Sequence, residues 1–472
     1  MHTEDRSKLL GTTPMARLVP KISIPIMFSM MIQALYNVVD SIFVSRFDPN
    51  GLTAVSLAAP FQFLMIALAT GMGTGINSLI SRRLGERNPE GARRASWNGL
   101  LIEVCGSILF LLFGLILARS TMGLVVSPNL ANYDSILNMG TDYLRIVTIF
   151  SMGLFMAIFC ERMLQATGNS VLSMIAQLSG ALTNIVLDPI MIFGYLGFPC
   201  MGVSGAAIAT VTGQFVSACV GFCLNQRKNP ELRLKLKEFM VNRYDLTGIF
   251  AVGLPSSIMA SIGSVMNVGM NAILSGFAES NAALNVMAVY FKLQSFIFMP
   301  VFGLSNGIVA ILAYNYGARI KERVYQCIRV ALTWAGTIML VGTLIFMIFP
   351  RQLMSIFESD AEAVITSQMT SIGVVAMRII AASFLFAAVG ITLSTVFQAV
   401  GKGTYSMIIS ICRQLLVLLP VAYLLKAVFG TVDAVWWCFV SAEAISLLLS
   451  LLLYRRCDRT MLQPLDGPAR VS

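Results

Sequence analysis

Charged residues are scarce in this sequence: Asp, Glu, Lys and Arg make up 12% of its 472 residues, whereas a soluble domain usually has about 25%. Apolar residues make up 57% and form long stretches that fill almost the whole chain. No segment has the composition of a soluble domain. The scarcity of charge therefore excludes a water-soluble protein and predicts an all-helical integral membrane protein.

Histidine and nucleotide-binding motifs are also missing or nearly so. The one histidine is His2, in the N-terminal tail, which excludes histidine catalysis and histidine-bound metal inside the membrane. No G-x-x-x-x-G-K-[ST] phosphate loop occurs, because the GKGT at 401–404 lacks the required upstream glycine. The nine cysteines form no CxxC pair and indicate neither a metal site nor a disulfide framework. We expect no cofactor, and ATP-driven pumping would require a separate subunit.

Many segments are long and apolar enough to cross a bilayer, whose hydrocarbon core of about 30 Å requires roughly 20 helical residues. We count about twelve of them. They lie at roughly 20–46, 53–81, 95–118, 136–159, 163–193, 201–225, 246–275, 281–315, 326–349, 364–395, 404–429 and 433–454.

The net charge of +10 comes from basic residues in alternate loops. Such loops mark the cytoplasmic side of a membrane protein, and an even number of spans places both termini on that side. We predict a multi-pass protein of the cytoplasmic (inner) membrane with both termini in the cytoplasm, and no binding of nucleic acid. The basic residues concerned are Arg6, Lys8, Arg17, Lys21, Arg82, Arg83, Arg87, Arg93, Arg94, Arg227, Lys228, Arg233, Lys235, Lys237, Arg243, Arg319, Lys321, Arg323, Arg455, Arg456 and Arg459.

The two halves of the chain repeat one another. Three glycines in the stretch GMGTGINSLISRRLG recur 232 residues later in GLSNGIVAILAYNYG, and QATGNS recurs as QAVGKG after 233 residues. Chance matching among glycine-rich apolar segments is a poor explanation, because separate blocks share nearly one offset. The repeated glycines are Gly71, Gly75 and Gly85 in the first copy and Gly303, Gly307 and Gly317 in the second.

A duplication of this kind predicts the architecture. Six spans in each half mean that both copies begin on the same side of the membrane. We predict two six-helix bundles related by a pseudo-two-fold axis along the membrane normal, with a cavity between them. The predicted units are an N-lobe at 1–225, a cytoplasmic linker at 226–245, and a C-lobe with a cytoplasmic tail at 246–472.

The linker is rich in basic residues and has two interpretations. In the first it is an amphipathic helix that lies on the cytoplasmic surface of the membrane. In the second it is a solvated basic segment. The side chains that face lipid in the first interpretation are Leu232, Leu234, Leu236 and Phe239.

Two carboxylates lie inside apolar segments, Asp40 in the first and Asp188 in the fifth. A charge near the bilayer centre costs about 3 kcal/mol or more, so such residues are rare without a function. Residues three or four apart share a helix face, which places Gln33 and Tyr36 beside Asp40 and Asn184 beside Asp188. These oxygens suit Na⁺ and suit shared protons equally well, so they predict a site for a coupling cation. The other half has no acid at the corresponding positions, which favours coupling over scaffolding.

Each of these residues also has a purely structural interpretation. Asp40 can pair with a basic residue of the other half, such as Lys292 or Arg413. Asp188 can cap a helix break at the proline that follows it, and Asn184 can form an ordinary hydrogen bond between helices. The sequence alone leaves these alternatives open.

Taken in order, the motifs resemble those of one known family. They are two six-span halves, the stretch PIMFSMMIQALYNVVD in the first span, and the QATGNS and N-x-x-x-D-P signatures. The chain is similar over nearly its full length to multidrug and toxin extrusion (MATE) transporters. The resemblance is closest to the bacterial and archaeal branch that has carboxylates in the N-lobe, which includes staphylococcal-type multidrug exporters.

The resemblance implies a set of site residues. In related transporters an aspartate of span one, with an asparagine and an aspartate of span five, forms the cation or proton site of the N-lobe. The matching residues here are Asp40, Asn184 and Asp188, as Na⁺ ligands or as proton carriers. Tyr36 matches an associated tyrosine, and Thr210 matches a threonine of span six.

The resemblance further implies that the first span bends at Pro25 when the aspartate is protonated; the plainer interpretation is a fixed kink. Sodium-coupled members of the other branch carry acids in spans seven and ten. The corresponding spans here show Asn267, Asn271 and Arg378 instead. We therefore expect no Na⁺ site in the C-lobe.

Aromatic and thioether side chains suit promiscuous binding of flat lipophilic cations. Lys292 and Arg413 lie deep within their spans and are expected to face the interior, either as charges that pair for helix packing or as ligands for anionic groups of a substrate. The residues predicted to line the substrate cavity are Gln33, Asn37, Phe61, Met65, Lys292, Phe296, Met299 and Arg413.

These features predict a monomeric antiporter, driven by H⁺ or Na⁺, that exports lipophilic and mainly cationic drugs by alternating access. The alternative is a lipid-linked precursor flippase of the same superfamily; such proteins tend to have several basic residues in the cavity and often extra spans. An aspartyl intramembrane protease is a third class. Its glycine-rich signatures do not match YNVVDS or NIVLDP, so we do not expect an enzyme.

Overall fold

The computed structural model describes residues 8–128, 132–235, 239–356 and 363–465. Within these residues the chain is helical almost throughout and contains no strand. Ten helices of this part are long and apolar enough to cross a membrane, or up to 12 if each of two bent helix pairs counts as one span. The predicted class, an all-helical protein with many membrane spans, is confirmed.

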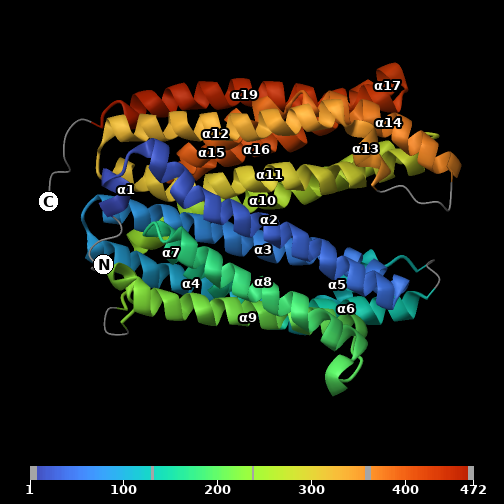
Figure 1. Ribbon diagram of the computed structural model, residues 1–472, viewed down its shortest axis with the longest axis horizontal. Coiled ribbons are helices and arrows are strands. Elements are labelled where there is room, and N and C mark those ends of the chain that lie inside the picture. The colour runs from blue at the N-terminus through green and yellow to red at the C-terminus, as the bar shows by residue number, and fades with distance from the viewer. Residues whose placement is uncertain (1–7, 129–131, 236–238, 357–362, 466–472) are drawn as a thin grey trace.

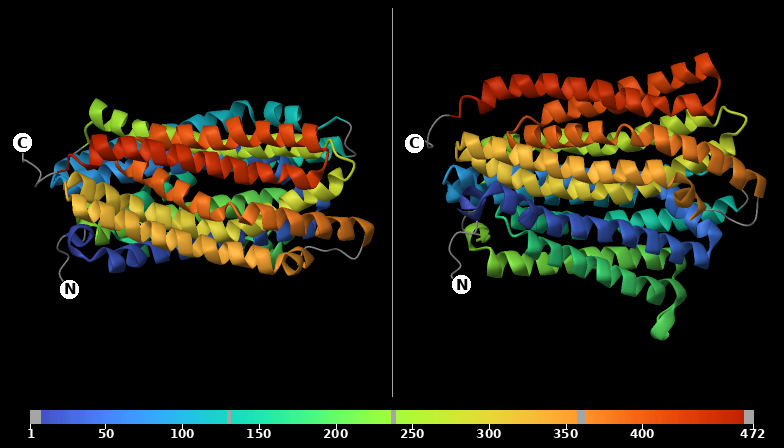
Figure 2. Two further views of the ribbon diagram at one scale, coloured as in Figure 1. Left: turned by 90° about the horizontal axis from the view of Figure 1, so that it is seen from above. Right: turned by 45° about the horizontal axis from the view of Figure 1, so that its top comes forward.

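The helices run nearly parallel along the long axis of the molecule, with the first half of the chain on one side and the second half on the other (Figures 1 and 2). The first half contains α1 (Lys8–Thr12), α2 (Met15–Phe47), α3 (Pro49–Gly85), α4 (Pro89–Ile116), α5 (Ala118–Val125), α6 (Tyr133–Ile149), α7 (Met152–Ala166), α8 (Ser170–Phe193), η1 (Tyr195–Gly197), α9 (Gly202–Lys228) and η2 (Pro230–Leu232). The second half contains α10 (Arg243–Leu274), α11 (Ser280–Gly317), α12 (Lys321–Ile348), α13 (Pro350–Ser355), α14 (Ala363–Ala381), α15 (Phe384–Ala399), α16 (Gly403–Ile411), η4 (Cys412–Leu418), α17 (Leu419–Phe429), α18 (Val432–Val435), α19 (Trp437–Cys457) and η5 (Asp458–Leu462).

Short polar signals fix where several of these helices begin. Asp48 precedes α3, and its side chain accepts a hydrogen bond from the backbone N–H of Asn50 (2.8 Å). Asn88 does the same before α4, where it accepts from the N–H of Gly91 (2.7 Å). Both caps are followed by proline, which is favoured at the first helical position because its missing N–H would have no partner there.

Each half contains one bent helix pair at the same place in the repeat. The helices α6 and α7 meet at 44°, and α14 and α15 meet at 48°. The sequence predicts one span at roughly 136–159 and one at 364–395, and the structure adds a bend to each. Beyond the bend, α7 packs on α9 and α15 packs on α12.

The turns between α3 and α4 and between α11 and α12 lie at one end of the molecule, together with α1 and the end of α19 (Figure 1). We call this the basic end, because basic residues cluster in these segments. The basic residues that define it are Arg82, Arg83, Arg87, Arg93, Arg94, Arg319, Lys321, Arg323, Arg455, Arg456 and Arg459. The other end, which contains α5, α13 and α17, is called the opposite end below.

The repeated glycines form the contact between the halves near the basic end. Here α3 packs on α10, and α11 packs on α2 and α3. A Cβ atom at Gly75 would lie 2.9 Å from the backbone N of Gly253 and would also strike the carbonyl oxygen of Ile249. A Cβ at the equivalent Gly307 would lie 2.6 Å from Oγ of Ser23. The two contacts are related by the internal repeat, so the spacing of glycines that revealed the duplication also permits the two halves to close.

The linker packs onto the first half. Between α9 and α10 the described residues contain only the short η2, and Leu232 at its end is fully buried. The side-chain oxygen of Asn98 accepts a hydrogen bond from the backbone N–H of Asn242 (2.9 Å). The ring of Phe239 packs edge-on against that of Trp97, with centroids 5.5 Å apart. Of the two interpretations of the linker, the amphipathic helix on the membrane surface is contradicted in the described part, because Leu232 is buried and only η2 is helical there. Leu236 lies outside that part.

A buried ion pair joins the halves beside the linker. Asp245, in the first turn of α10, is 0% exposed, and its carboxylate accepts a hydrogen bond from Nε of Arg94 on α4 (2.6 Å). Nη2 of Arg83 on α3 lies 3.6 Å from the other carboxylate oxygen. Removing one partner of a buried pair leaves the other charge without compensation, and that is where the energetic cost arises.

We therefore expect Asp245→Asn to lower the free energy of unfolding by about 1–3 kcal/mol, a range reduced because both arginines are partly exposed. The measurement is thermal unfolding in detergent, followed by a thiol-reactive dye at the buried cysteines Cys160, Cys327 and Cys438. The matched control is Glu86→Gln, which removes a partly exposed pair with Arg83 (3.0 Å) and should change stability by less than about 0.5 kcal/mol. Equal shifts in both variants would contradict the assignment.

Candidate functional site

The helices α2, α8 and α9 pack side by side in the first half. Glycines permit the close approach of α8 and α9: a Cβ at Gly180 would lie 2.6 Å from the carbonyl oxygen of Gly213, and a Cβ at Gly213 would lie 2.6 Å from that of Gly180. This contact lies one helical turn from Asn184, which faces α9. The polar residues of two helices are thereby brought within hydrogen-bond reach.

Asn184 lies at the centre of the site. Its Nδ2 donates to Oδ1 of Asp188 (3.2 Å) on the same helix and to Oγ1 of Thr210 (3.4 Å) on α9. Asp188 is 0% exposed, Asn184 is 3% and Thr210 is 7%. The structure therefore brings together three of the predicted site residues, including Thr210, which only the family resemblance had suggested.

The helix α2 supplies the other two residues. Asp40 and Tyr36 lie one turn apart on α2, which packs on α8. The Asp40 carboxylate and the Asp188 carboxylate interact electrostatically, and both act on the Tyr36 hydroxyl. The two acids that lie 148 residues apart in sequence thus belong to one site.

Three buried oxygens of this site accept no hydrogen bond from any side chain or backbone group that the structure describes: Oδ1 of Asp40, Oδ1 of Asn184 and Oδ2 of Asp188. Buried acceptors are normally paired, because an unpaired one has lost its hydration without replacement. All three are hard oxygen acceptors, and two belong to carboxylates. This set fits a proton or an oxygen-coordinated cation such as Na⁺.

Tyr143 of α6 was not predicted as part of this site. It is 3% exposed, its hydroxyl donates to Oε1 of Gln62 on α3 (3.1 Å), and it interacts electrostatically with Asp40 and Asp188. A tyrosine and a glutamine in two different apolar segments give no local signal. Only the packing of α6 on α3 brings them to the acids.

Other predicted residues of α2 lie apart from the oxygen set. Oε1 of Gln33 accepts a hydrogen bond from Nε2 of Gln177 (3.3 Å), two helical turns from Asp40 toward the basic end. The helix continues without a break through Pro25, whose carbonyl accepts a hydrogen bond from Ser29 (2.9 Å). Bending at Pro25 stays a prediction. The side chain of Asn37 lies outside those that the structure describes.

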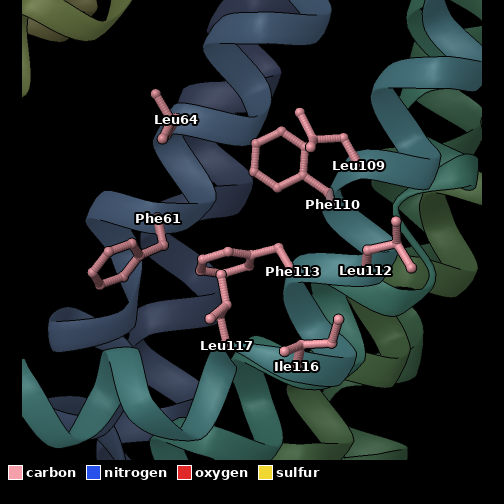
Figure 3. Close-up of a pocket in the computed structure, with 8 residues that line it drawn as sticks. All are labelled: Phe61, Leu64, Leu109, Phe110, Leu112, Phe113, Ile116 and Leu117. Carbon is pink, nitrogen blue, oxygen red and sulfur yellow. The ribbon is translucent and has the colours of Figure 1, made fainter.

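Two residues predicted for the substrate cavity lie elsewhere. Met65 is 0% exposed and packs inside the first half against Phe110 and Phe155. Phe61 stacks on Phe113, with ring centroids 6.3 Å apart. It lines an apolar pocket of about 380 Å³ between α3 and α4, whose wall includes Ile116, 69% exposed on the outer face of the bundle (Figure 3). Met65 and Phe61 both lie on the side of α3 that packs against other helices of the first half. They therefore lie away from the contact between the two halves.

Along α11, exposure changes between the two ends of the molecule. A stripe of exposed residues at helical spacing runs through Asn285, Ala288, Lys292 and Phe296 in the part toward the opposite end. From Gly303 toward the basic end most residues of α11 are buried. An asparagine and a lysine facing lipid at this depth would be costly. Lys292 and Phe296 lie on this exposed stripe, and Met299 follows one turn later, half-buried. That these three residues line a substrate cavity stays a prediction.

Arg413 pairs within its own half. Its Nη1 lies 3.0 Å from Oε1 of Glu443, from the π-helical turn η4 to α19. Pairing of Asp40 with Arg413, one of the two structural alternatives given for Asp40, is excluded in this arrangement, because the Arg413 guanidinium already has Glu443 as its carboxylate partner. Pairing for helix packing, the plainer of the two predicted roles, describes what Arg413 does.

The fold and the site together define a membrane transporter with a candidate cation site buried in one of two related helical bundles. The family model described as MatE matches residues 25–190 and 255–424, once in each half, and the chain belongs to this family. It is accordingly a transporter and no enzyme, and the predicted family is confirmed.

Among the chain's relatives is the "Multidrug export protein MepA" of Staphylococcus haemolyticus (strain JCSC1435), 25% identical over 440 residues, or 93% of each chain. Among solved structures, "Crystal structure of MATE in complex with MaL6" has a TM-score of 0.89 at 26% identity and covers 98% of this chain and 100% of that one. "Outward-facing conformation of a multidrug resistance MATE family transporter of the MOP superfamily" has a TM-score of 0.88 at 26% identity, with the same coverage.

Proposed function

We propose that this protein is an antiporter of the cytoplasmic membrane that exports lipophilic, mainly cationic compounds in exchange for H⁺ or Na⁺. The observation that carries the proposal is the set of three unpaired oxygens on Asp40, Asn184 and Asp188. A bound cation or proton would satisfy them, and its release would leave two buried carboxylates without compensation. Coupling requires that the site bind its ion more strongly in one state of the protein than in the other.

Alternating access is supported by the unequal ends of the molecule. The repeated glycines hold the halves together near the basic end, whereas α11 is exposed along a stripe toward the opposite end. We take the basic end as cytoplasmic, because basic loops mark that side. Export then requires a second state, in which the glycine contacts separate and the opposite end closes. The names of the relatives support drugs as the exported compounds.

The test is transport by purified protein in liposomes, with a pH gradient and a Na⁺ gradient imposed separately. Efflux of a fluorescent lipophilic cation such as ethidium should follow one of these gradients and should stop when an ionophore collapses it. Ethidium efflux at the same rate with and without each gradient would overturn the proposal.

A lipid-linked precursor flippase remains the alternative, and the same liposomes test it. The structure weakens this alternative, because Arg413, one of the two deep basic residues, is already neutralised by Glu443. Translocation of a lipid-linked sugar by liposomes that do not transport ethidium would favour the flippase.

A further inference from the structure

A second cluster of charged side chains lies inside the first half, away from the site described above. Glu103 of α4 is 0% exposed, and neither of its carboxylate oxygens has a hydrogen-bond partner among the described residues. Arg162 of α7 is 6% exposed and acts electrostatically on Glu103 and on the neighbouring Glu161. The predictions from sequence included none of these three residues.

A hydrogen-bond network fixes most of this cluster. Nη1 of Arg162 donates to Oε1 of Gln165 (2.9 Å), and Nε2 of Gln165 donates to Oε1 of Glu161 (2.8 Å) and to Oγ of Ser173 (3.1 Å). Gly73 of α3 leaves room for the arginine, since a Cβ there would lie 3.0 Å from its Cγ. The QATGNS motif therefore supplies the glutamine that holds the guanidinium in place.

The charges of the cluster do not balance. Two carboxyl groups, Glu103 and Glu161, lie within electrostatic reach of one guanidinium inside the membrane-spanning part of the bundle, and Nη1 of that guanidinium donates to Gln165. A buried carboxylate without a counter-charge is too costly to persist, so one of the two must carry a proton or hold a cation. The positive charge of Arg162 disfavours a metal cation at this place, which leaves the proton.

No other described charge balances Glu103. Arg162 is the charged side chain that acts on it among the described residues. The acidic residue of α10 that lies near α4, Asp245, is engaged with Arg83 and Arg94 at the basic end.

The equivalent positions in the second half of the chain show which side chains can fill this part of the bundle. The helix α12 repeats α4 at an offset of 232, and α15 ends 233 residues after α7. The counterparts of Glu103 and Arg162 are thereby Ala335, 0% exposed, and Thr395, 2% exposed.

Only the uncharged members of the cluster recur in the second half. The glutamine and the serine are kept as Gln398 and Ser406, both buried, and Glu161 is replaced by Ser394. The fold can fill this position without any charge, so the acids and the arginine are not needed for packing.

A stripe of small and polar side chains connects the cluster with the Asp40–Asp188 site. On α8, residues at spacings of three or four run from Ser173 through Gln177 and Gly180 to Asn184 and Asp188. The 15 residues from Ser173 to Asp188 span about 22 Å of helix. The cluster lies at the basic-end side of this stripe, and the cation site lies at the other.

We propose that Glu103, Glu161 and Arg162 form a second proton-binding site, through which protons pass between the Asp40–Asp188 site and the compartment at the basic end. The proposal rests on the antiport function proposed above. In each cycle Glu103 first releases its proton to water at the basic end. Its carboxylate oxygen then accepts, through water, a proton that leaves a carboxyl oxygen of Asp40 or Asp188, and Arg162 stays protonated throughout.

The test is Glu103→Gln in liposomes that contain a pH-sensitive dye, with ethidium-driven proton flux and ethidium transport both recorded. We expect proton flux roughly tenfold or more slower than in the wild type. Binding of ethidium in detergent should keep its Kd within about twofold. The matched control is Glu90→Gln, which removes an exposed acid from the same helix and should behave as the wild type.

A second variant covers the case in which Glu103→Gln does not fold. The triple change Glu103→Ala, Glu161→Ser and Arg162→Thr copies the second half of the chain, where these residues pack well, and it should fold and show the same loss of proton flux. Normal proton flux in either folded variant overturns the proposal. If the wild-type protein couples transport to Na⁺ without proton movement, the proposed second proton-binding site is overturned but the antiport function stands. If wild-type liposomes transport ethidium with neither gradient, the antiport function itself is refuted.

Discussion

Replacing Asp188 with asparagine is expected to reduce export of lipophilic cations to the level of protein-free liposomes, with expression and folding unchanged. Asparagine keeps the size of the side chain, so packing around α8 is preserved. It removes the negative charge and one of the unpaired acceptors that, with Asp40 and Asn184, make the site fit a cation or proton. Asp40→Asn should give the same result, because the two carboxylates interact within one site.

The measurement is ethidium efflux from liposomes, supported by drug accumulation in cells that express each variant. The matched control is Asp134→Asn, which removes an exposed acid from the first turn of α6, at the opposite end, and should export normally. If both site variants export at the wild-type rate, the acids serve only to hold the helices together, and the proposed coupling site is wrong.

Adding one methyl group at Gly75 is expected to open the basic end. A Cβ there would strike the carbonyl oxygen of Ile249 and lie 2.9 Å from the backbone N of Gly253, and backbone atoms of a helix cannot move aside without separating α3 from α10. Overpacking of this kind costs about 1–3 kcal/mol. If this cost applies only to the state in which the basic end is closed, the population ratio of the open-basic-end state to the closed-basic-end state rises by roughly 5- to 150-fold.

The shift is measurable as a distance between spin labels on Glu90 and Glu322, exposed residues in the first turns of α4 and α12. The exposed native cysteines are replaced first. Gly75→Ala should broaden and lengthen the distance distribution. The matched control is Gly336→Ala on α12, where a Cβ would meet nothing within 4 Å. A Gly75→Ala distribution identical to the wild type would show that the glycine contact does not hold the halves together.

The acids of the cation site could be found from the sequence because each violates a strong local rule. Asp40 and Asp188 are charged residues inside apolar helices, and that cost is visible without knowing any neighbour. Tyr143 and Gln62 violate no such rule, since single polar residues in a long helix are common. Their role arises only where α3, α6 and α2 meet.

Glu103 and Arg162 show the limit of the same reasoning. Glu103 lies in the apolar segment predicted at 95–118 and therefore carried the same signal as Asp40, whereas Arg162 fell between the segments predicted at 136–159 and 163–193 and carried none. They lie on different helices, 59 residues apart, so nothing in the sequence showed that they share one buried cluster. The comparison of the two halves became informative for them only when the helix bounds of α4 and α12 fixed the alignment.

The errors have a common cause as well. Met65 was assigned to the substrate cavity by its place in the repeat, but it is buried between α3, α4 and α7. One of the two interpretations of the linker was an amphipathic helix whose leucines face lipid. In the structure Leu232 is fully buried instead. In both cases the sequence showed that the residue is apolar but did not show which surface it faces.

The sequence by itself determined that the chain lies in a membrane with many spans, that its halves repeat, and which half carries the acidic pair. These are local or periodic properties, set by the length and apolarity of segments and by the spacing of glycines. The tertiary structure decided which faces meet: the convergence of α2, α8 and α9 at Asp188, the closure of the halves on paired glycines, and the burial of Glu103 beside Arg162. Contacts between distant segments depend on the packing of whole helices against one another, and no single segment contains that information.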